Sequence, residues 1–321
     1  MSPGSKSVAV ARNAMATRFE ILLCGEDPVS LRAAGEEALD EIVQIEAQLS
    51  LHRATSEVSH LNARAASGPV RVTPSLFALL RQARGLWEDS EGAFDITIAP
   101  LARAWGFTQR TGRVPSEQEL GAARACVGMD KLSFNDEECS IQFSTPGLQL
   151  DFGAIGKGYA IERAAALLRD LDITRALLHG GTSTVHAIGS PPGADAWIIA
   201  IDSAPGPDSP PLAKVPLVDE SLSVSAVWGK SFAAEDETFG HVLDPRSGRP
   251  VQNALLAAVV TPSATESDAL STALLARASS GPAWLEKLRP ASRSLLLSGA
   301  GALRTAAARG IDLLPLPEFA N

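Results

Sequence analysis

The sequence predicts an α+β fold in which mixed sheets carry flanking helices. Apolar residues make up 45% of the 321 residues and charged residues 20%, a globular composition that can supply a large core. Strand-like and helix-like segments follow one another in a mixed order, without the regular alternation that is typical of a doubly wound parallel sheet. The chain shows no internal repeat and no long run of charge, so we expect a single domain over residues 1–321, or two closely packed lobes.

Composition excludes several classes of function. Lys and Arg total 28 against 37 Asp and Glu, and the net charge of −9 argues against a protein that binds nucleic acid through its phosphate backbone. Aromatic residues are only 5%, which is too few for a base-stacking platform. The three cysteines lack CxxC spacing, so we expect neither a disulfide framework nor a cysteine zinc site.

The N-terminal segment predicts neither a secretory signal nor a membrane span. Its apolar stretch is interrupted by Arg12, Asn13 and Arg18, and no small-residue cleavage site or lipobox follows. The chain nowhere contains the roughly 18 consecutive apolar residues that a membrane helix requires. We therefore expect a cytoplasmic protein.

The first third of the chain predicts two strands and two long helices. Residues 8–24 alternate in polarity, which favours two strands that turn around residues 13–15. The Asp27-Pro28 pair is typical of a helix start, and apolar spacing extends this helix over 28–49. A second helix is predicted to begin at Thr73-Pro74. The buried faces of the two helices are expected to contain Leu31, Ala38, Ile42, Ile45 and Leu49, and Leu76, Leu80, Ala83 and Trp87.

Shorter elements are predicted along the rest of the chain. Residues 108–120 predict a loop that enters a short helix, and the proline-rich stretch 204–211 predicts a loop within the domain. A glycine-rich turn over 153–158 opens onto another helix. Strands are expected at 140–143, 148–151, 173–178, 196–201, 254–260 and 294–297, and a late helix at 267–278.

The stretch Asp151-Phe-Gly-Ala-Ile-Gly-Lys-Gly158 is a candidate anion cradle. Its glycines let the backbone approach a phosphate, the following helix offers free N–H groups, and Lys157 adds a positive charge. It is neither a Walker A loop nor a GxGxxG motif. A tight strand-to-helix connection with a solvated lysine explains the same pattern, so both interpretations stay open.

The stretch Thr265-Glu-Ser-Asp-Ala-Leu-Ser-Thr272 is a candidate cation site. Asp268 and Thr272 are four residues apart and so share one face of a helix. A carboxylate with a hydroxyl is a pair of hard oxygen donors that suits Mg²⁺. The alternative is ordinary capping of a helix start by Thr265 or Ser267, with Asp268 stabilised by the helix dipole.

Two further motifs contain candidate functional side chains. His241 is predicted on a short strand before an Asp-Pro turn, and histidine is a natural general base near neutral pH. The aromatic residues of Ala93-Phe94-Asp95 and Trp105-Gly106-Phe107 could wall a flat ligand, or simply belong to the core. No histidine pair has HxxxH or HExxH spacing, and Gly-x-Ser-x-Gly is absent.

Taken in this order, the motifs resemble the ApbE-like FAD:protein FMN transferase family. The resemblance covers roughly residues 15 to 275, and the DFGAIGKGYA, HVLDPRSG and ATESDALSTAL blocks are specific in combination. It implies an ApbE-like, T-fold-like architecture with the flavin site between the two lobes, if there are two. The matching stretches are 15–17, 56–62, 93–107, 150–164, 179–189, 240–251 and 262–274.

The resemblance implies an enzyme that cleaves FAD with the help of Mg²⁺, releases AMP and attaches FMN to a Ser or Thr hydroxyl of an acceptor protein. The implied acceptor motif is Asp-x-x-Ser/Thr-Gly-Ala-Thr/Ser. His241 falls where the family has a histidine proposed to activate the acceptor hydroxyl, and His52 stands where an aromatic is usual. The implied metal ligands are the carbonyl of Ala154 and the side chains of Asp268 and Thr272. The implied flavin contacts are Met15, His52, Ala93, Phe94, Asp95, Asp151, Lys157 and Gly240.

Two other functions remain possible interpretations of the same motifs. An FAD pyrophosphatase would use water as the acceptor and release free FMN and AMP. A non-catalytic flavin-binding protein would bind FAD without turnover.

Overall fold

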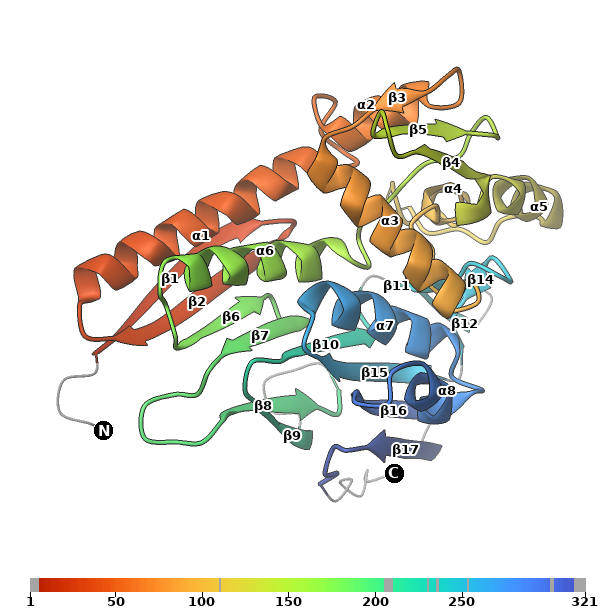
Figure 1. The fold of residues 1–321 in the computed structure, drawn as a ribbon. Coiled ribbons are helices and arrows are strands. Elements are labelled where there is room, and N and C mark those ends of the chain that lie inside the picture. The colour runs from red at the N-terminus through yellow and green to blue at the C-terminus, as the bar shows by residue number, and fades with distance from the viewer. Residues whose placement is uncertain are drawn as a thin grey trace.

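An antiparallel sheet of eight strands organises the molecule (Figure 1). The computed structural model describes residues 6–109, 111–204, 210–229, 231–234, 237–252, 254–300 and 303–314. The predicted loop over 204–211 falls mainly on residues 205–209, outside these ranges. In spatial order the strands are β1 (Lys6–Ala14), β2 (Thr17–Gly25), β6 (Ala176–Gly180), β7 (Thr184–Ile188), β10 (Ser221–Ala226), β15 (Ala254–Thr261), β16 (Arg293–Ala300) and β17 (Leu303–Arg309).

Helices cover one face of this sheet and a hairpin covers part of the other. Figure 1 shows α1 (Pro28–Leu49), α6 (Gly156–Asp170) and α7 (Ala264–Ala276) lying over the strands on one face of the sheet. On the opposite face, the hairpin of β8 (Trp197–Asp202) and β9 (Pro211–Leu217) packs in a second hydrophobic cluster. The predicted α+β class is confirmed, since every neighbouring strand pair of the sheet is antiparallel and helices flank it.

The remaining elements gather mostly at one end of the molecule (Figure 1). The helix α3 (Pro74–Asp89) runs from this end towards α7, and α8 (Gly281–Leu288) packs beside β16. A 3-10 turn occupies Met129–Lys131. The other elements are α2 (Glu57–Arg64), β3 (Val70–Arg71), α4 (Ala99–Ala104), α5 (Glu117–Ala125), β4 (Leu132–Asn135), β5 (Ser140–Phe143), β11 (Ser231–Ala234), β12 (Glu237–Gly240), β13 (Leu243–Asp244) and β14 (Arg249–Pro250).

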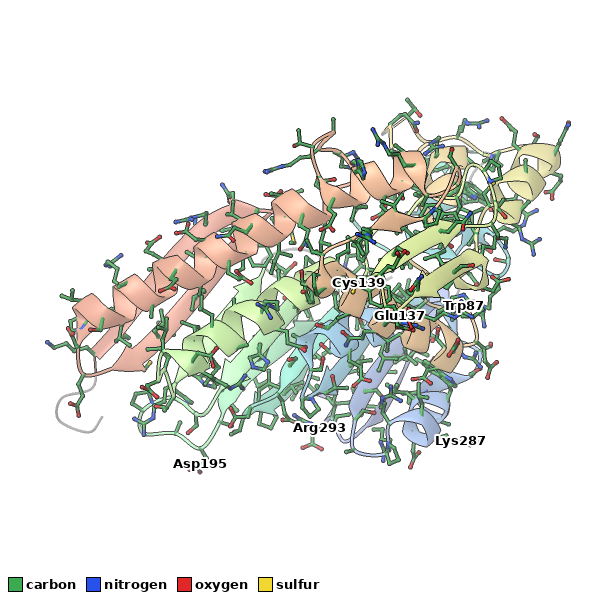
Figure 2. The ribbon with its side chains drawn as sticks, turned by 45° about the horizontal axis from the view of Figure 1, so that its top comes forward. Trp87, Glu137, Cys139, Asp195, Lys287 and Arg293 are labelled. Carbon is green, nitrogen blue, oxygen red and sulfur yellow. The ribbon has the colours of Figure 1, made fainter. Side chains whose placement is uncertain are left out.

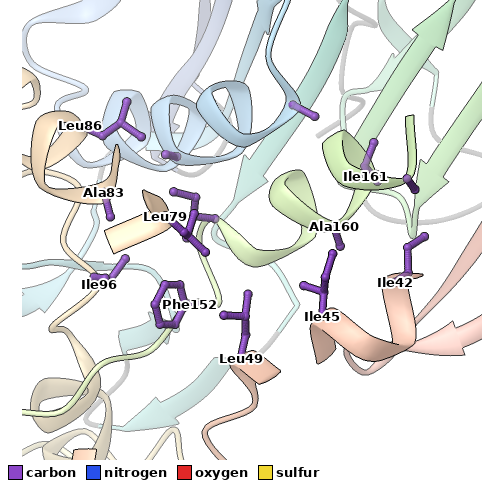
Figure 3. Close-up of a cluster of buried hydrophobic side chains, with 14 of the residues drawn as sticks. Ile42, Ile45, Leu49, Leu79, Ala83, Leu86, Ile96, Phe152, Ala160 and Ile161 are labelled. Carbon is purple, nitrogen blue, oxygen red and sulfur yellow. The ribbon is translucent and has the colours of Figure 1, made fainter. Parts of the chain in front are cut away.

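Burial on both faces of the sheet explains why β15 is apolar along its whole length. Successive side chains of a strand point to opposite faces, so Ala257 and Val259 pack under the helices while Leu256 and Ala258 face the hairpin side. On the helix side, Figure 3 shows how α1, α3 and α6 converge on Phe152. The labelled side chains there are Ile42, Ile45, Leu49, Leu79, Ala83, Leu86, Ile96, Phe152, Ala160 and Ile161.

Charged residues lie mainly at the outside of this arrangement. In Figure 2, Asp195 in the loop before β8 and Lys287 near the end of α8 both project away from the sheet. None of the described helices is both long and apolar enough to cross a membrane.

The two long helices form as predicted. The helix over 28–49 has Asp27 as its N-cap, and its five expected core residues are buried. Thr73 caps α3, where Leu86 is buried and Trp87 is only partly buried, because the buried face ends on Leu86. Residues 111–116 form a loop that enters α5, as expected.

Several other predicted elements need correction. Residues 148–151 form no strand, because the side-chain amide of Asn62 bonds to both the N–H and the C=O of Leu150 and takes the place of a strand partner. The strand predicted at 173–178 begins at Ala176, since α6 and its following turn extend further. The strand predicted at 196–201 spans Trp197–Asp202 and has exposed alternate residues, with Ile198 60% exposed, because it belongs to the two-stranded hairpin.

The late helix also begins earlier than predicted. α7 starts at Ala264 because the side chain of Ser263 accepts a hydrogen bond from Glu266 N, and Glu162 on α6 accepts one from Thr265 N. Ser263 is therefore the cap, and neither Thr265 nor Ser267 is. Asp268 consequently lies inside the helix, with 4% of its surface exposed, where capping does not explain it.

Candidate functional site

The buried carboxylate of Asp268 lies where α6 and α7 meet. Its Oδ2 accepts a hydrogen bond of 2.9 Å from the backbone N–H of Gly158, and its Oδ1 accepts one of 3.4 Å from the hydroxyl of Thr184. The ammonium of Lys157 lies 3.8 Å from Oδ1. Burying a carboxylate is costly unless donors or cations compensate it, and these three groups do so here.

The hydroxyl of Thr272 lies one turn further along α7. It is 3.0 Å from the hydroxyl of Ser225 on β10, which is also 2.8 Å from the hydroxyl of Ser271. Ser271 donates a hydrogen bond of 2.9 Å to the carbonyl of Asp268. Thr272 thus belongs to a hydroxyl cluster that joins the sheet to the helix.

The glycine-rich turn approaches this cluster through Lys157. The ammonium of Lys157 donates a hydrogen bond of 3.4 Å to the carbonyl of Gly153, and the N–H of Gly153 donates one of 2.8 Å to Asp151 Oδ1. Ala154 follows Gly153 directly, in the turn that precedes α6. The structure therefore brings Asp151, Lys157 and Asp268 together, although more than 100 residues separate the last two.

The segment 93–97 joins the same region through the backbone of Asp151. The N–H of Asp151 donates a hydrogen bond of 2.7 Å to the carbonyl of Ile96. Phe94 is 1% exposed and belongs to the main core, and its backbone N–H donates a hydrogen bond of 3.0 Å to Ser90 Oγ. Of the two interpretations of this motif, the structure favours core packing for the Phe94 ring.

Asp95 is a buried carboxyl group with a raised pKa. Its Oδ1 accepts hydrogen bonds from the N–H and the hydroxyl of Thr97, at 2.7 and 2.6 Å. Burial outweighs these bonds and raises the pKa of Asp95 from 3.8 to about 6. A perturbed carboxyl group beside the glycine-rich turn is a candidate site residue on physical grounds.

The raised pKa predicts a pH-dependent stability. The unfolded carboxyl loses its proton at a lower pH than the folded one, so the contribution of Asp95 is full below about pH 4 and is lost as the pH rises through about 6. In Asp95→Asn this loss is absent, so the stability of the variant relative to the wild type should rise by roughly 1–3 kcal/mol between pH 4.5 and pH 8. Thermal unfolding of both proteins at several pH values measures this difference, and a difference that stays constant with pH would contradict the assignment.

Met15 and the segment that contains His52 both lie near the C-terminal end of α1. Met15 is in the tight turn between β1 and β2, where its φ of +49° is left-handed, and its N–H donates a hydrogen bond of 2.8 Å to Glu46. Glu46 also pairs with Arg53, the neighbour of His52, at 3.3 Å. The turn between the two strands is centred on residues 15–16, one step beyond the predicted centre.

The same end of α1 packs against the start of α6. A methyl group built on Gly156, the first residue of α6, would lie 4.0 Å from Leu49, the last residue of α1. Met15, His52 and the glycine-rich turn therefore belong to one region of the molecule.

Gly240 and His241 connect two short hairpins near the end of β10. His241 is exposed and lies in the bend after β12, so its prediction as a strand residue is wrong; the ladder ends at Gly240. Gly240 packs against Val227, whose carbonyl would be 2.8 Å from a methyl group on Gly240. The imidazole Cε1 of His241 would be 3.9 Å from a methyl group on Gly229. His241 therefore lies beside the loop that follows Ser225.

Sequence patterns did not identify Thr184, Ser225 and Gly158 as partners of the predicted ligands. A usable signal exists for β10, where Ser223 and Ser225 alternate with Leu222, Val224 and Ala226 and so place two hydroxyls on one face. No comparable signal exists for Thr184, because its contact with Asp268 depends on the packing of α7 against β7.

A hollow of about 440 Å³ lies beyond the C-terminal end of α7. Leu275 and Ala276 line it together with Val251 and Gln252, which follow β14. Leu275 is three residues after Thr272, so the hollow begins about one helical turn from the hydroxyl cluster. In the described part of the chain, no three His, Cys, Asp or Glu side chains form a metal-binding group.

Curated relatives and solved structures resemble this chain over most of its length. A FAD:protein FMN transferase of Klebsiella pneumoniae is 28% identical over 67% of this chain, and the match spans 66% of that relative, just under two thirds. One of Haemophilus influenzae is 26% identical over 84% of this chain and 80% of the relative.

The structural likeness is closer than the identity indicates. The ApbE protein of Thermotoga maritima superposes with a TM-score of 0.85 at 25% identity, covering 95% of this chain and 97% of that one. The flavinyl transferase ApbE of Pseudomonas stutzeri gives 0.83 at 28% identity, covering 95% of both chains. The model of the ApbE family matches residues 15–295, and the chain therefore belongs to the ApbE family.

Proposed function

We propose that this protein transfers FMN from FAD to a Ser or Thr hydroxyl of an acceptor protein, with release of AMP and with the help of Mg²⁺. The observation that carries the proposal is the Asp268 cluster, in which a buried carboxylate, a hydroxyl and a lysine converge beside a helix N-terminus. This set can bind a dianionic pyrophosphate together with a cation. The names of the curated relatives support the transfer of FMN.

The donor chemistry around Asp268 fits Mg²⁺. A carboxylate, a hydroxyl and a backbone carbonyl are the hard oxygen donors that this ion prefers. A cationic group already lies between the turn and the carboxylate, because Lys157 contacts both Gly153 O and Asp268 Oδ1. In the proposal the carbonyl of Ala154 and the side chains of Asp268 and Thr272 hold the ion, which neutralises charge on the pyrophosphate oxygens.

The remaining residues bind the substrate and move one proton. Lys157 and the start of α6 orient the pyrophosphate by charge and by backbone N–H groups. In the proposal the flavin half of FAD lies against Met15, His52, Ala93, Phe94, Asp95, Asp151 and Gly240.

The reaction exchanges a phosphoanhydride bond of FAD for a phosphoester bond to the acceptor. The acceptor hydroxyl oxygen bonds to the phosphorus on the riboflavin side, and the bond from that phosphorus to the bridging oxygen breaks. AMP leaves with the bridging oxygen, while His241 accepts the hydroxyl proton. The exposure of His241 suits this role, because an acceptor protein must reach it from outside.

Covalent flavin fluorescence tests the proposal. The protein is incubated with FAD, Mg²⁺ and an acceptor bearing Asp-x-x-Ser/Thr-Gly-Ala-Thr/Ser, and the products are separated on a denaturing gel. We expect a fluorescent acceptor band that disappears with EDTA. In His241→Ala the band should weaken by about 10²–10⁴-fold, the usual contribution of a general base.

His60→Ala is the matched control, because His60 is an exposed histidine on α2 outside this region. It should leave the fluorescent band unchanged. Free FMN and AMP without a band would instead identify an FAD pyrophosphatase. Tight binding of FAD without any turnover would identify a flavin-binding protein, and either result contradicts the proposal.

A further inference from the structure

We infer that Ser225 is a positioning residue, which sets the orientation of the Thr272 hydroxyl so that its lone pairs face the cation. The inference rests on the proposed function, in which Thr272 is a ligand. It concerns the contacts of one serine on β10 that lies across from α7. Ser225 Oγ is 2.8 Å from Ser271 Oγ and 3.0 Å from Thr272 Oγ1.

Counting donors gives the direction of each hydrogen bond in the cluster. Ser271 can donate its only hydroxyl proton to the carbonyl of Asp268 at 2.9 Å, so its oxygen is left as an acceptor. Ser225 then donates to Ser271, and its own oxygen can accept from Thr272. The chain of bonds runs from Thr272 through Ser225 and Ser271 to the Asp268 carbonyl.

This direction has a consequence for Thr272. Among the described residues, the other acceptor within reach of its proton is the carbonyl of Asp268, at the longer distance of 3.4 Å. The bond to Ser225 at 3.0 Å is therefore the better one, and it turns the proton towards the sheet. Both lone pairs of Thr272 Oγ1 are then available for a cation. Without Ser225 the hydroxyl can rotate, and its proton is free to point at the cation.

The same strand supplies a matched control. Ser223 lies two residues earlier on the same face of β10, and its hydroxyl is 2.8 Å from Ser267, about one turn before Ser271 on α7. Ser223→Ala removes an equivalent hydroxyl pair between β10 and α7 without touching Thr272. Any effect that comes only from weaker packing of β10 against α7 should appear in both variants.

The test measures cation affinity directly. Mn²⁺ is titrated into the full-length protein with FAD and without acceptor, and free Mn²⁺ is followed by its paramagnetic resonance signal. In Ser225→Ala we expect the Mn²⁺ dissociation constant to rise by about 10–100-fold, the usual cost of removing a residue that orients a metal ligand. Ser223→Ala should bind as the wild type does, and Ser225→Thr, which keeps the hydroxyl, should restore most of the affinity.

Two outcomes would overturn the inference. One is an equal change in Ser225→Ala and Ser223→Ala, with equal losses of thermal stability, which would make Ser225 merely structural. The other is wild-type protein that binds no Mn²⁺ with FAD. The first outcome leaves the proposed function intact. The proposed function fails separately where wild-type protein binds Mn²⁺ but gives no fluorescent acceptor.

Discussion

Replacement of Asp268 by asparagine is expected to abolish FMN transfer while the protein stays folded. Asparagine has the same shape, and its carbonyl oxygen can still accept the hydrogen bond from Gly158 N–H. The variant lacks the negative charge that balances Lys157, 3.8 Å away, and that would hold the proposed cation. We expect kcat/KM to fall by at least about 10³-fold, which corresponds to about 4 kcal/mol of transition-state stabilisation.

The control for Asp268→Asn is Glu266→Gln on the same helix. Glu266 pairs with Arg289 at 2.6 Å, and within the described part of the chain its carboxylate has no hydrogen bond to the hydroxyl cluster. This variant should therefore lose stability without losing transfer. Rates of transfer at saturating Mg²⁺ and FAD distinguish the two variants. An Asp268→Asn protein that keeps a tenth of wild-type activity would remove the metal assignment.

Gly158→Ala is expected to disrupt both the fold around the site and the activity. Gly158 sits where α6 approaches α7 most closely, and a methyl group there would lie 2.7 Å from Asp268 Cβ and closer still to the carbonyl of Ala264. Real side chains do not tolerate such contacts, so the two helices must separate. Overpacking of this kind costs about 1–3 kcal/mol of folding free energy. Separation also breaks the hydrogen bond from Gly158 N–H to Asp268, so transfer should be lost as well.

Gly85→Ala is the control for this prediction. Gly85 lies inside α3, and a methyl group on it would meet no atom within 4 Å. Alanine should therefore stabilise the protein by about 0.5–1 kcal/mol through its better helix propensity. Chemical denaturation of both variants gives the two free energies of unfolding. A Gly158→Ala protein as stable and active as the wild type would show that the approach of α6 to α7 is unimportant.

The sequence predicted those elements whose signals are local. The helix over 28–49 is marked by Asp27 and Pro28 and by five apolar residues at helical spacing, and the structure has the same bounds. The start of α7 was misplaced because its cap involves Glu162, a residue about 100 positions away on α6. The strand expected at 148–151 does not form for the same reason, a distant contact. The side chain of Asn62 bonds to Leu150 in place of a strand partner.

The candidate site could be found from the sequence only in part. The motifs identify Lys157, Asp268 and Thr272 as candidate site residues, because each belongs to a recognisable local pattern. Two of these residues have hydrogen-bond partners on strands: Thr184 bonds to Asp268, and Ser225 bonds to Thr272. The positions of those strands follow from the order of the sheet. Side-chain partners of this kind are set by tertiary packing, which leaves almost no mark on local sequence.

The central claim is that FAD cleavage and protein modification are one reaction. The most direct measurement is to count AMP and acceptor-bound FMN in the same sample, with wild-type protein, FAD, Mg²⁺ and the acceptor. Transfer predicts one AMP for each FMN attached to the acceptor, and no AMP when the acceptor hydroxyl is replaced by alanine. Release of AMP in excess of bound FMN, or at an unchanged rate without the acceptor hydroxyl, would contradict it.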